Sequence, residues 1–314
     1  MLSIEQINQW KNKGYLISKN IINKNLTLKC TELLNKKYYD EKTACKDFGS
    51  KGELEFFSNT ILDQISVNLN IINCVKQLLN TNDILLIQSD AWGKAGKNTD
   101  TEFNNNDQRM HMDYGNNTFL HPSDWNNPEC VAVIIYFSDT NETGGKTAVV
   151  PRNGVNDELY QYPYINMPGQ NKYKFYNDKN HSENYFKQNY PEIYKFRQKL
   201  YNREIFADTN IGDILFYRLD TWHRGTPVKK GKVRNVMNLL WKKKECHWIN
   251  SWNPGFSKKM YYGYLEKFIE SLNPEQRATI GFPLPGDKYW NIKKIQLLKF
   301  RYPKINIKPY LSKL

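Results

Sequence analysis

The sequence has few of the residues that build disulfide-linked, zinc-binding or membrane-spanning proteins. Its five cysteines are widely scattered and never form a C-x-x-C pair, which argues against a disulfide framework and a zinc knuckle. It contains no run of about 18 uncharged apolar residues, so we expect no membrane span. The N-terminus lacks both a basic segment followed by an apolar stretch and a small-residue cleavage site, so we expect no signal peptide. These absences predict a cytoplasmic protein in a reducing compartment.

What the sequence does have is basic charge and many aromatic residues. Its 314 residues include 45 Lys and Arg against 32 Asp and Glu, a net charge of +13, and 14% are aromatic. Such an aromatic content fills a core, which excludes a wholly disordered chain. The lysines are spread along the sequence, without an arginine-rich cluster or an aromatic-basic repeat. We therefore interpret most of the charge as solvated surface and keep nucleic acid only as a less favoured partner.

The N-terminal part, residues 1–80, is predicted to be mainly helical and to buttress a sheet. Ser3 and Gln6 have the spacing of a capping box, and Gly14 stands where the first helix would stop. A short strand and two more helices are expected after it, over residues 15–17, 25–38 and 61–79.

From Asp83 onward, short β-branched or aliphatic runs bounded by polar loops predict strands. Links of the hairpin type would join them into an antiparallel barrel or sandwich. Because no internal repeat or separate linker is present, we expect one domain over 1–314 of the α+β class, with a mainly β core at 84–241 and a C-terminal extension at 242–314. The expected strands cover 84–88, 131–137, 144–151, 213–219 and 233–241.

The β core is interrupted by an insertion, residues 155–205, which is rich in Tyr, Asn and Lys. A long insertion in a β domain is usually a lid or a substrate-side loop, although a surface excursion without function stays open. In the C-terminal extension we expect a helix over 259–271, and aromatics of 281–290 that pack back on the core. The insertion would form an aromatic, cationic wall that favours an anionic substrate, from Tyr160, Tyr162, Tyr164, Tyr173 and Tyr176 with Lys172 and Lys174.

Histidines are few, and two of the five stand in a metal-binding pattern. His111 and Asp113 are two residues apart, so on extended backbone both face the same way and can share one metal ion. His223, just after the strand expected at 213–219, is the best third ligand. Two imidazoles and one carboxylate form a facial triad that leaves positions on Fe(II) open for a cosubstrate and O2. We assign structural or surface roles to His121, His181 and His247.

Arg234 begins the next expected strand, eleven residues after His223. We expect a hairpin turn around Lys230 to place Arg234 opposite Thr226, three residues along the strand from His223. At about 3.3 Å per residue, its guanidinium would lie roughly one small dicarboxylate away from the metal. The planar fork of an arginine binds a carboxylate through two hydrogen bonds. The joint pattern therefore predicts a metal-dependent oxygenase.

These motifs resemble the phytanoyl-CoA dioxygenase-like family of Fe(II)/2-oxoglutarate-dependent oxygenases. The likeness spans about 84–241, and segments 4–17 and 281–290 are also similar to parts of some members. It implies a double-stranded β-helix core, of the jelly-roll or cupin-like kind, with helices at both ends. The residues that carry it are His111-Met112-Asp113, 131–139, Gly144-Gly145, 149–151, 212–216, His223-Arg224-Gly225 and Arg234.

The resemblance also implies roles for single residues. Fe(II) would be held by His111, Asp113 and His223, and the distal carboxylate of 2-oxoglutarate by Arg234. Members often use a polar residue on the strand before the H-x-D motif and a small hydroxyl two residues after the distal histidine to hold the cosubstrate. The nearest matches are Gln88 and Thr226, because Gly225 occupies the usual hydroxyl position.

The predicted activity is the hydroxylation of a C–H bond in a small organic substrate, anionic if the basic insertion lines the site. Fe(II), 2-oxoglutarate and O2 would be required, and succinate and CO2 released. Asp113 argues against halogenation, because halogenating relatives have a small residue in place of that carboxylate. An oxygenase acting on nucleic acid or protein, a non-catalytic β-barrel binding protein and a metal hydrolase remain alternatives. No heptad repeat or interface signature predicts the oligomeric state.

Overall fold

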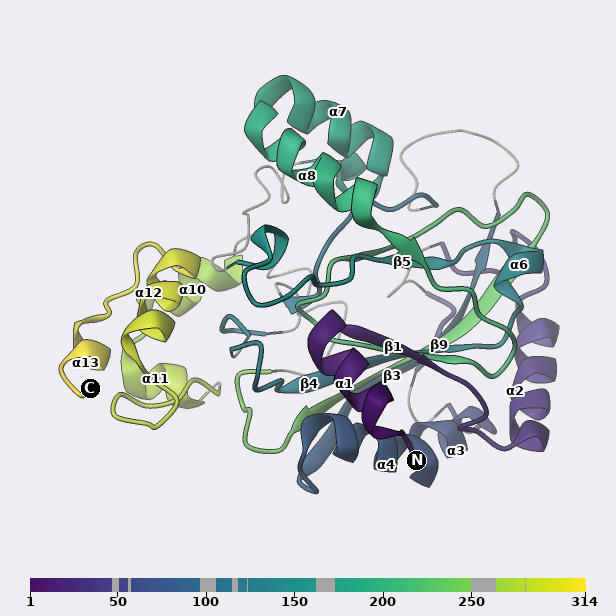
Figure 1. Cartoon of the computed structure of the whole chain (residues 1–314), viewed down its shortest axis with the longest axis horizontal. Coiled ribbons are helices and arrows are strands. Elements are labelled where there is room, and N and C mark those ends of the chain that lie inside the picture. The colour runs from purple at the N-terminus through teal and green to yellow at the C-terminus, as the bar shows by residue number, and fades with distance from the viewer. Residues whose placement is uncertain are drawn as a thin grey trace.

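The β core consists of two antiparallel sheets, one of six strands and one of three (Figure 1). The structure is a computed structural model, which describes residues 1–46, 51–55, 58–96, 106–114, 118–122, 124–161, 173–249, 264–279 and 281–314. The strand order is β1-β7-β4-β9-β3-β2 in the large sheet and β6-β5-β8 in the small sheet. The strands are β1 (Tyr15–Ser18), β2 (Leu54–Glu55), β3 (Ile84–Ala95), β4 (Cys130–Tyr136), β5 (Thr147–Val149), β6 (Ile205–Phe206), β7 (Ile214–Tyr217), β8 (His223–Gly225) and β9 (Val233–Lys243).

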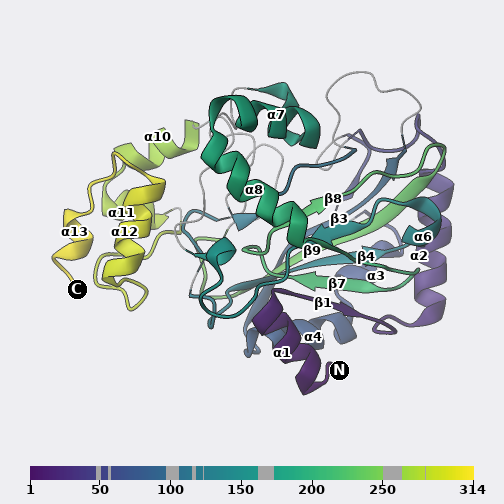
Figure 2. The same ribbon diagram turned by 45° about the horizontal axis from the view of Figure 1, so that its top comes forward.

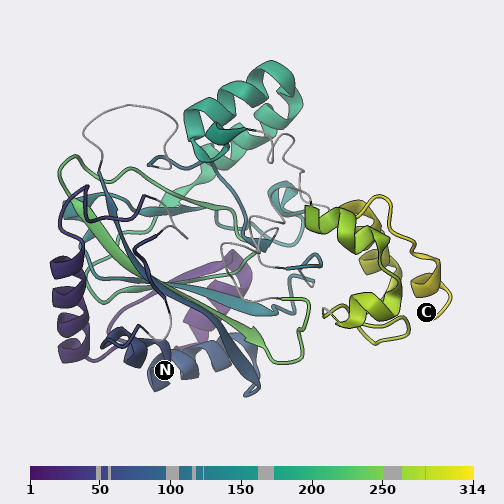
Figure 3. The same ribbon diagram turned by 180° about the vertical axis from the view of Figure 1, so that it is seen from behind.

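Helices flank this core, and in sequence they lie before, between and after its strands. Three of them, α2, α3 and α4, contact strands β9, β3 and β4 respectively, and the view from behind shows them against the large sheet (Figure 3). The helices are α1 (Ile4–Lys13), α2 (Lys24–Lys37), α3 (Leu62–Ser66), α4 (Leu69–Leu79), α6 (Thr140–Thr143), α7 (Lys179–Asn189), α8 (Pro191–Arg203), α10 (Tyr264–Ser271), α11 (Pro274–Thr279), α12 (Ile292–Arg301) and α13 (Lys308–Leu311).

The large sheet has an outer face covered by helices and an inner face turned toward the small sheet. On the outer face, Ser89 of β3 bonds to Ser66 of α3 at 2.8 Å. On the inner face, the hydroxyl of Tyr136 on β4 donates to Thr147 of the small sheet at 2.7 Å. Because side chains alternate along a strand, the register with β4 assigns the inner-facing residues of the other central strands. They are Gln88, Asp90, Trp92 and Lys94 on β3, and Arg234, Val236, Asn238 and Leu240 on β9.

The N-terminal elements follow from local signals. Ser3 and Gln6 form the expected capping box at the start of α1, and Gly14 ends it in the left-handed region at φ 89°, which a glycine adopts without steric cost. The third expected helix is divided in two, because Asn68 caps a new helix, α4, directly after α3. The caps and the glycine stop therefore fix these helices locally.

The insertion folds into a helical hairpin, α7 and α8, that lies over the small sheet (Figure 2). Short 3-10 turns precede it at Glu158–Tyr160 and Lys174–Asn177. Tyr162, Tyr164 and Lys172, which we expected in an aromatic wall, lie outside the described residues. Polar, Asn-rich composition hid the two helices from sequence analysis, because it weakens the apolar periodicity that marks a helix.

The C-terminal helices form a group at one end of the molecule (Figure 1). As expected, aromatics of 281–290 pack on the core: the rings of Phe119 and Phe282 are 5.2 Å apart, and those of Trp248 and Tyr289 are 4.4 Å apart. The expected start of the helix at 259 lies outside the described residues. Within the described ranges, no helix has the length and apolar content to cross a membrane.

The expected hairpin between the strands of His223 and Arg234 is wrong. Strand β8 pairs with β5 in the small sheet, whereas β9 pairs with β3 and β4 in the large sheet. Beyond β8 the chain stays paired with the segment before β5, where the Lys229 N–H donates to the carbonyl of Thr143 at 2.8 Å, and it joins the large sheet only at β9. Consequently Thr226 does not lie opposite Arg234.

Candidate metal centre

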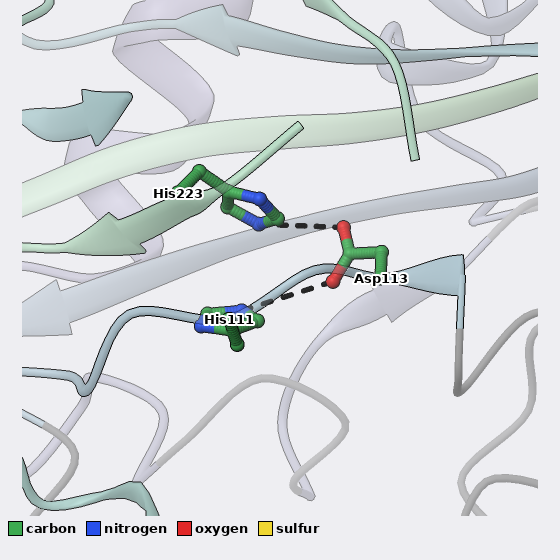
Figure 4. Close-up of side chains that lie close together, drawn as sticks. All are labelled: His111, Asp113 and His223. Carbon is green, nitrogen blue, oxygen red and sulfur yellow. Dashed lines mark ion pairs between the residues drawn. The ribbon is translucent and has the colours of Figure 1, made fainter. Parts of the chain in front are cut away.

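Two side chains of one short segment, His111 and Asp113, meet the distant His223 between the sheets (Figure 4). The Nε2 atom of His111 lies 3.7 Å from Oδ1 of Asp113, and Nε2 of His223 lies 3.4 Å from Oδ2 of the same carboxylate. One ligand atom from each of the three residues falls within 4.8 Å of the others. The structure thus brings together the three residues that the sequence predicted as metal ligands.

Backbone and side-chain hydrogen bonds orient both imidazoles. His111 and His223 exchange both backbone hydrogen bonds, at 2.9 and 2.8 Å. The Nδ1 atom of His111 donates to the carbonyl of Arg109 at 3.0 Å, and that of His223 donates to the carbonyl of Thr221 at 2.9 Å. A bond at Nδ1 fixes the tautomer and leaves the Nε2 lone pair for a metal.

Burial keeps His111 neutral. It lowers the pKa of this imidazole well below its usual value, and the nearby His223 and Arg109 lower it further. A neutral imidazole is the form that binds a metal ion.

Tyr217 of β7 orients the carboxylate of Asp113, a contact that the sequence did not reveal. Its hydroxyl donates to Oδ2 of Asp113 at 2.9 Å, and its ring lies 4.7 Å from the ring of His223. Burial raises the pKa of Tyr217 well above its usual value, and the neighbouring Asp113 adds to the rise. The hydroxyl therefore stays protonated and remains a donor.

The donor set fits a divalent transition metal. Two Nε2 atoms and one carboxylate converge from two chain segments, and each has an outer hydrogen bond that fixes its direction. Two histidines and one carboxylate with open positions form the facial triad of non-heme Fe(II) sites. A structural zinc site, in contrast, is closed by four ligands, and the described residues offer only these three here.

Arg234 lies on the inner face of β9, opposite Lys94 of β3 rather than Thr226. Only 5% of its surface is exposed, and its Nη1 donates to the carbonyl of Gly145 at 2.7 Å. Its Nε atom is buried and has no hydrogen-bond partner among the described residues. A buried donor without a partner is costly, so this edge of the guanidinium is suited to bind an anion.

Gly145 makes this position of Arg234 accessible. It adopts φ +71°, and a Cβ there would lie 2.7 Å from Cγ2 of Val228 and 3.0 Å from Cδ of Arg234. Only a glycine combines that backbone conformation with so close an approach. Lys94, also buried, extends toward Gly225, whose ideal Cβ would lie 3.7 Å from its Nζ, and donates to the carbonyl of Asn106 at 3.0 Å. Sequence analysis missed Lys94 because β3 runs on to Ala95, well beyond the expected end at Gln88.

The structure does not bring Gln88 or Thr226 to Arg234. Gln88 pairs with Leu240, so it lies about 20 Å from Arg234 along the sheet, at about 3.3 Å per residue. The hydroxyl of Thr226 donates to the carbonyl of Lys146 at 2.7 Å, and Thr226 lines an outer cavity of about 710 Å³.

The helical hairpin braces the metal-binding segment from outside. Arg197 of α8 is fully buried and bonds to Glu183 of α7 at 2.6 Å. The same guanidinium donates to the carbonyl of Met110 at 3.2 Å, and the hydroxyl of Tyr201 accepts from the Met110 N–H at 3.0 Å. Both backbone groups of the residue before His111 are therefore held by the insertion.

Two tyrosines that we expected in the wall, Tyr160 and Tyr176, are internal. Tyr176 is buried beneath the guanidinium of Arg109, 4.3 Å from its ring centre. The buried hydroxyl of Tyr160 donates to the carbonyl of Val150. These two side chains support the fold and do not form the expected wall, whereas Tyr173 stacks on Phe175 at 5.0 Å.

The remaining three histidines lie apart from the metal-binding triad. His121 is buried, and burial lowers its pKa to about 3. His181 is half exposed and pairs with Asp178 at 2.9 Å, and His247 is exposed. All five cysteines are buried and unpaired.

Comparison with solved structures finds a similar fold in three proteins. EvdO2 from Micromonospora carbonacea var. aurantiaca is similar with a TM-score of 0.52 at 7% identity, over 77% of this chain and 91% of EvdO2. The non-heme alpha-ketoglutarate-dependent carbocyclase SnoK from nogalamycin biosynthesis gives 0.51 at 14% identity, over 77% of this chain and 84% of SnoK. HygX from Streptomyces hygroscopicus, with nickel and 2-oxoglutarate bound, gives 0.50 at 10% identity, over 81% of this chain and 90% of HygX.

At such low identity the likeness concerns the fold alone. No protein-family profile matches the chain, and no curated protein matches it by sequence. Membership of the phytanoyl-CoA dioxygenase-like family therefore stays a prediction.

Proposed function

We propose that the chain is an Fe(II)/2-oxoglutarate-dependent oxygenase that acts on a small molecule. The observation that carries this is the convergence of His111, Asp113 and His223 between two antiparallel sheets, with Arg234 on the inner face of the larger one. Structures of the same fold hold nickel and 2-oxoglutarate in HygX, and 2-oxoglutarate in EvdO2. We propose one oxygenase unit over 1–314, with a double-stranded β-helix core.

In this proposal His111, Asp113 and His223 hold Fe(II). Bound iron, with 2-oxoglutarate and O2, supplies the oxidising power that breaks a substrate C–H bond, and the cosubstrate leaves as succinate and CO2. Tyr217 keeps the Asp113 carboxylate in one orientation through its 2.9 Å hydrogen bond.

Arg234 would bind the distal carboxylate of 2-oxoglutarate. Its unpartnered Nε edge offers donors in the planar fork that a carboxylate accepts bidentately. The bond from Nη1 to Gly145 holds the fork in one direction, and burial strengthens a charge-assisted hydrogen bond made there. Lys94, opposite Arg234, adds a second positive charge to this end of the site.

The activity is tested by succinate release from the Fe(II)-loaded chain with 2-oxoglutarate under O2, without any added substrate. We expect slow succinate formation that disappears in Asp113→Ala and in Arg234→Leu, while His247→Ala, an exposed histidine, retains it. Failure of the wild-type protein to release succinate, although it binds iron, contradicts the oxygenase proposal and favours a binding protein.

The fate of the oxygen atoms of O2 reports on the outcome of the reaction. Hydroxylation predicts one oxygen atom from O2 in the product, whereas ring closure or epimerisation predicts none. Isotope labelling with 18O2 and mass spectrometry of the product therefore distinguishes these outcomes once a substrate is in hand.

A further inference from the structure

Two inner-face residues, Asp90 of β3 and Asn238 of β9, lie directly opposite each other in the large sheet. Asn238 is four residues from Arg234, which is about 13 Å along the strand. In the other direction its next inner-face neighbour is Leu240, which shares a row with Ala132 and Tyr217. The pair therefore lies between the arginine and the row of the tyrosine that reaches the metal carboxylate.

Both residues carry a buried oxygen without a partner. Among the described residues, neither Oδ2 of Asp90 nor Oδ1 of Asn238 has a hydrogen-bond partner. Each residue is only partly buried, and both stand on the inner face of the large sheet. A buried acceptor without a donor costs on the order of 1–3 kcal/mol, and such groups in a folded protein call for an explanation.

The charge around the pair is negative. Glu55 of β2 is the neighbour of Asp90 on its other side and faces the same way. Burial raises the pKa of Asp90 to about 6, the hydrogen bond from Gln88 opposes the rise, and Glu55 adds to it. At neutral pH this group is still an anion, with no described cation bonded to it.

A ligand that pairs with these two oxygens must bring hydrogen-bond donors, and a cationic ligand also balances the negative charge of Asp90. A carboxylate has no donor and would be repelled. A neutral hydroxyl would donate without balancing the negative charge. An ammonium group has a positive charge and several N–H donors, so one such group can donate to Asp90 and to Asn238 at the same time.

We propose that Asp90 and Asn238 bind a protonated amine of the substrate, which makes an aminated small molecule the substrate class of this site. The inference rests on the proposed oxygenase function and deepens it. It replaces the anionic substrate that the lysines of the insertion favoured. The site then has two ends of opposite charge: Arg234 with Lys94 for the cosubstrate, and Asp90 with Asn238 for the substrate.

The test uses matched probes in which one carbon frame carries an amine, an alcohol or a carboxylate. Three sets cover aromatic, aliphatic and sugar frames: benzylamine, benzyl alcohol and benzoate; hexylamine, hexanol and hexanoate; glucosamine, glucose and glucuronate. Binding is measured by ligand-observed NMR on the full chain loaded with Zn(II) and 2-oxoglutarate, which does not turn over. We expect at least one amine to bind about tenfold or more tightly than its two counterparts, the advantage of a charge-assisted hydrogen bond.

The variants locate the preference. Asp90→Asn, which keeps the shape, should abolish the amine advantage, and Asn238→Leu should reduce it. Asp83→Asn removes one exposed carboxylate at the start of the same strand and should leave the advantage unchanged. Thermal unfolding of each variant verifies that it is folded.

Three results overturn the proposal: no amine binds at millimolar concentration, a carboxylate binds as tightly as its amine, or Asp90→Asn keeps the preference. Succinate release without substrate separates this proposal from the oxygenase proposal. If Asp90→Asn still releases succinate like the wild type, loss of amine binding concerns the substrate pocket alone. If neither the wild type nor the variant releases succinate, the oxygenase proposal fails. Amine binding is then judged by the NMR result alone.

Discussion

His111 and His223 are joined as a bridged pair, each accepting a backbone hydrogen bond from the other at 2.9 and 2.8 Å, with ring centres 4.4 Å apart. The backbone of each histidine ligand is therefore held by that of the other, which fixes the spacing of the two imidazoles.

Removing one ligand should abolish tight metal binding. For His223→Ala we expect the Co(II) affinity to fall by more than the roughly 10–100-fold that the loss of an outer-sphere partner causes. The measurement is a titration of the metal-free chain followed by the visible absorption of bound Co(II). His181→Ala, which removes a half-exposed histidine paired with Asp178, is the control. Equal affinities in the two variants would contradict the assignment of His223 as a ligand.

Tyr217→Phe should weaken metal binding without unfolding the protein. The variant keeps the ring that contacts His223 but loses the hydroxyl that orients Asp113, so we expect roughly 10–100-fold lower affinity. Isothermal titration with Zn(II) measures it, and Tyr39→Phe, at an exposed tyrosine, serves as the control. Wild-type affinity would mean that the hydroxyl is not needed to hold the carboxylate.

Gly145→Ala should weaken 2-oxoglutarate binding. The added Cβ meets Val228 and Arg234, at 2.7 and 3.0 Å, and displaces the guanidinium. Gly231→Ala is a matched control, because Gly231 has nearly the same φ, +73°, and nothing within 4 Å of the added Cβ. Both variants carry the backbone strain, and only the first should raise the Kd of 2-oxoglutarate, by about tenfold or more for a disturbed charge-assisted bond. Equal Kd values would show that the contact with Arg234 does not matter.

Asp90→Asn should stabilise the protein at neutral pH. Because burial raises the pKa of Asp90 from 3.8 to about 6, the folded state holds its proton more tightly than the unfolded state does. Its contribution is complete below about pH 4 and is lost as the pH rises through about 6, a change of about 2–3 kcal/mol. Denaturant unfolding at pH 4 and pH 7.5 should show the stability difference between variant and wild type increasing by that amount. A difference independent of pH would mean that Asp90 is not held in this environment.

Breaking the buried ion pair of the insertion should weaken the metal site. Arg197→Met leaves Glu183 buried without its cation, although the hydroxyl of Tyr201 still donates to it, which costs about 3–5 kcal/mol of stability. Replacing both charges, Arg197→Met with Glu183→Leu, should recover most of that stability but not the bond to the Met110 carbonyl.

The double variant thus separates stability from positioning. We expect it to unfold near the wild-type temperature and to bind Co(II) more weakly. Lys195→Met, at an exposed lysine of the same helix that pairs with Glu192, is the control. Wild-type Co(II) affinity in the double variant would show that the hairpin does not position His111.

Sequence reasoning succeeded where the determinants are local or chemically distinctive. The capping box of Ser3 and Gln6 and the stop at Gly14 depend on a few neighbouring residues. The spacing of His111 and Asp113, with His223 after a strand, combines residue types that few other roles require together. Those three residues meet in the structure as the pattern predicted.

Sequence reasoning failed where a residue's position depends on which distant strands pair with each other. The hairpin expected between Thr226 and Arg234 required that strands adjacent in sequence pair, whereas β8 and β9 belong to different sheets. Lys94 and Asp90 were missed because β3 runs past its expected end at Gln88 and because their inner-face positions follow from the register with β9. The strand of Tyr217 is wholly apolar, so its sequence does not show which of its side chains face inward. Tyr217 therefore could not be singled out from the sequence.

The brace between Arg197 and Met110 has a consequence for the order in which this protein folds. The Arg197 and Glu183 contact spans 14 residues, whereas the Arg197 and Met110 contact spans 87. Short loops close at lower entropic cost, so the hairpin can form before it captures the segment that carries His111. The metal-binding segment is then among the later parts to become ordered, and amide hydrogen exchange at Met110 would report its local opening.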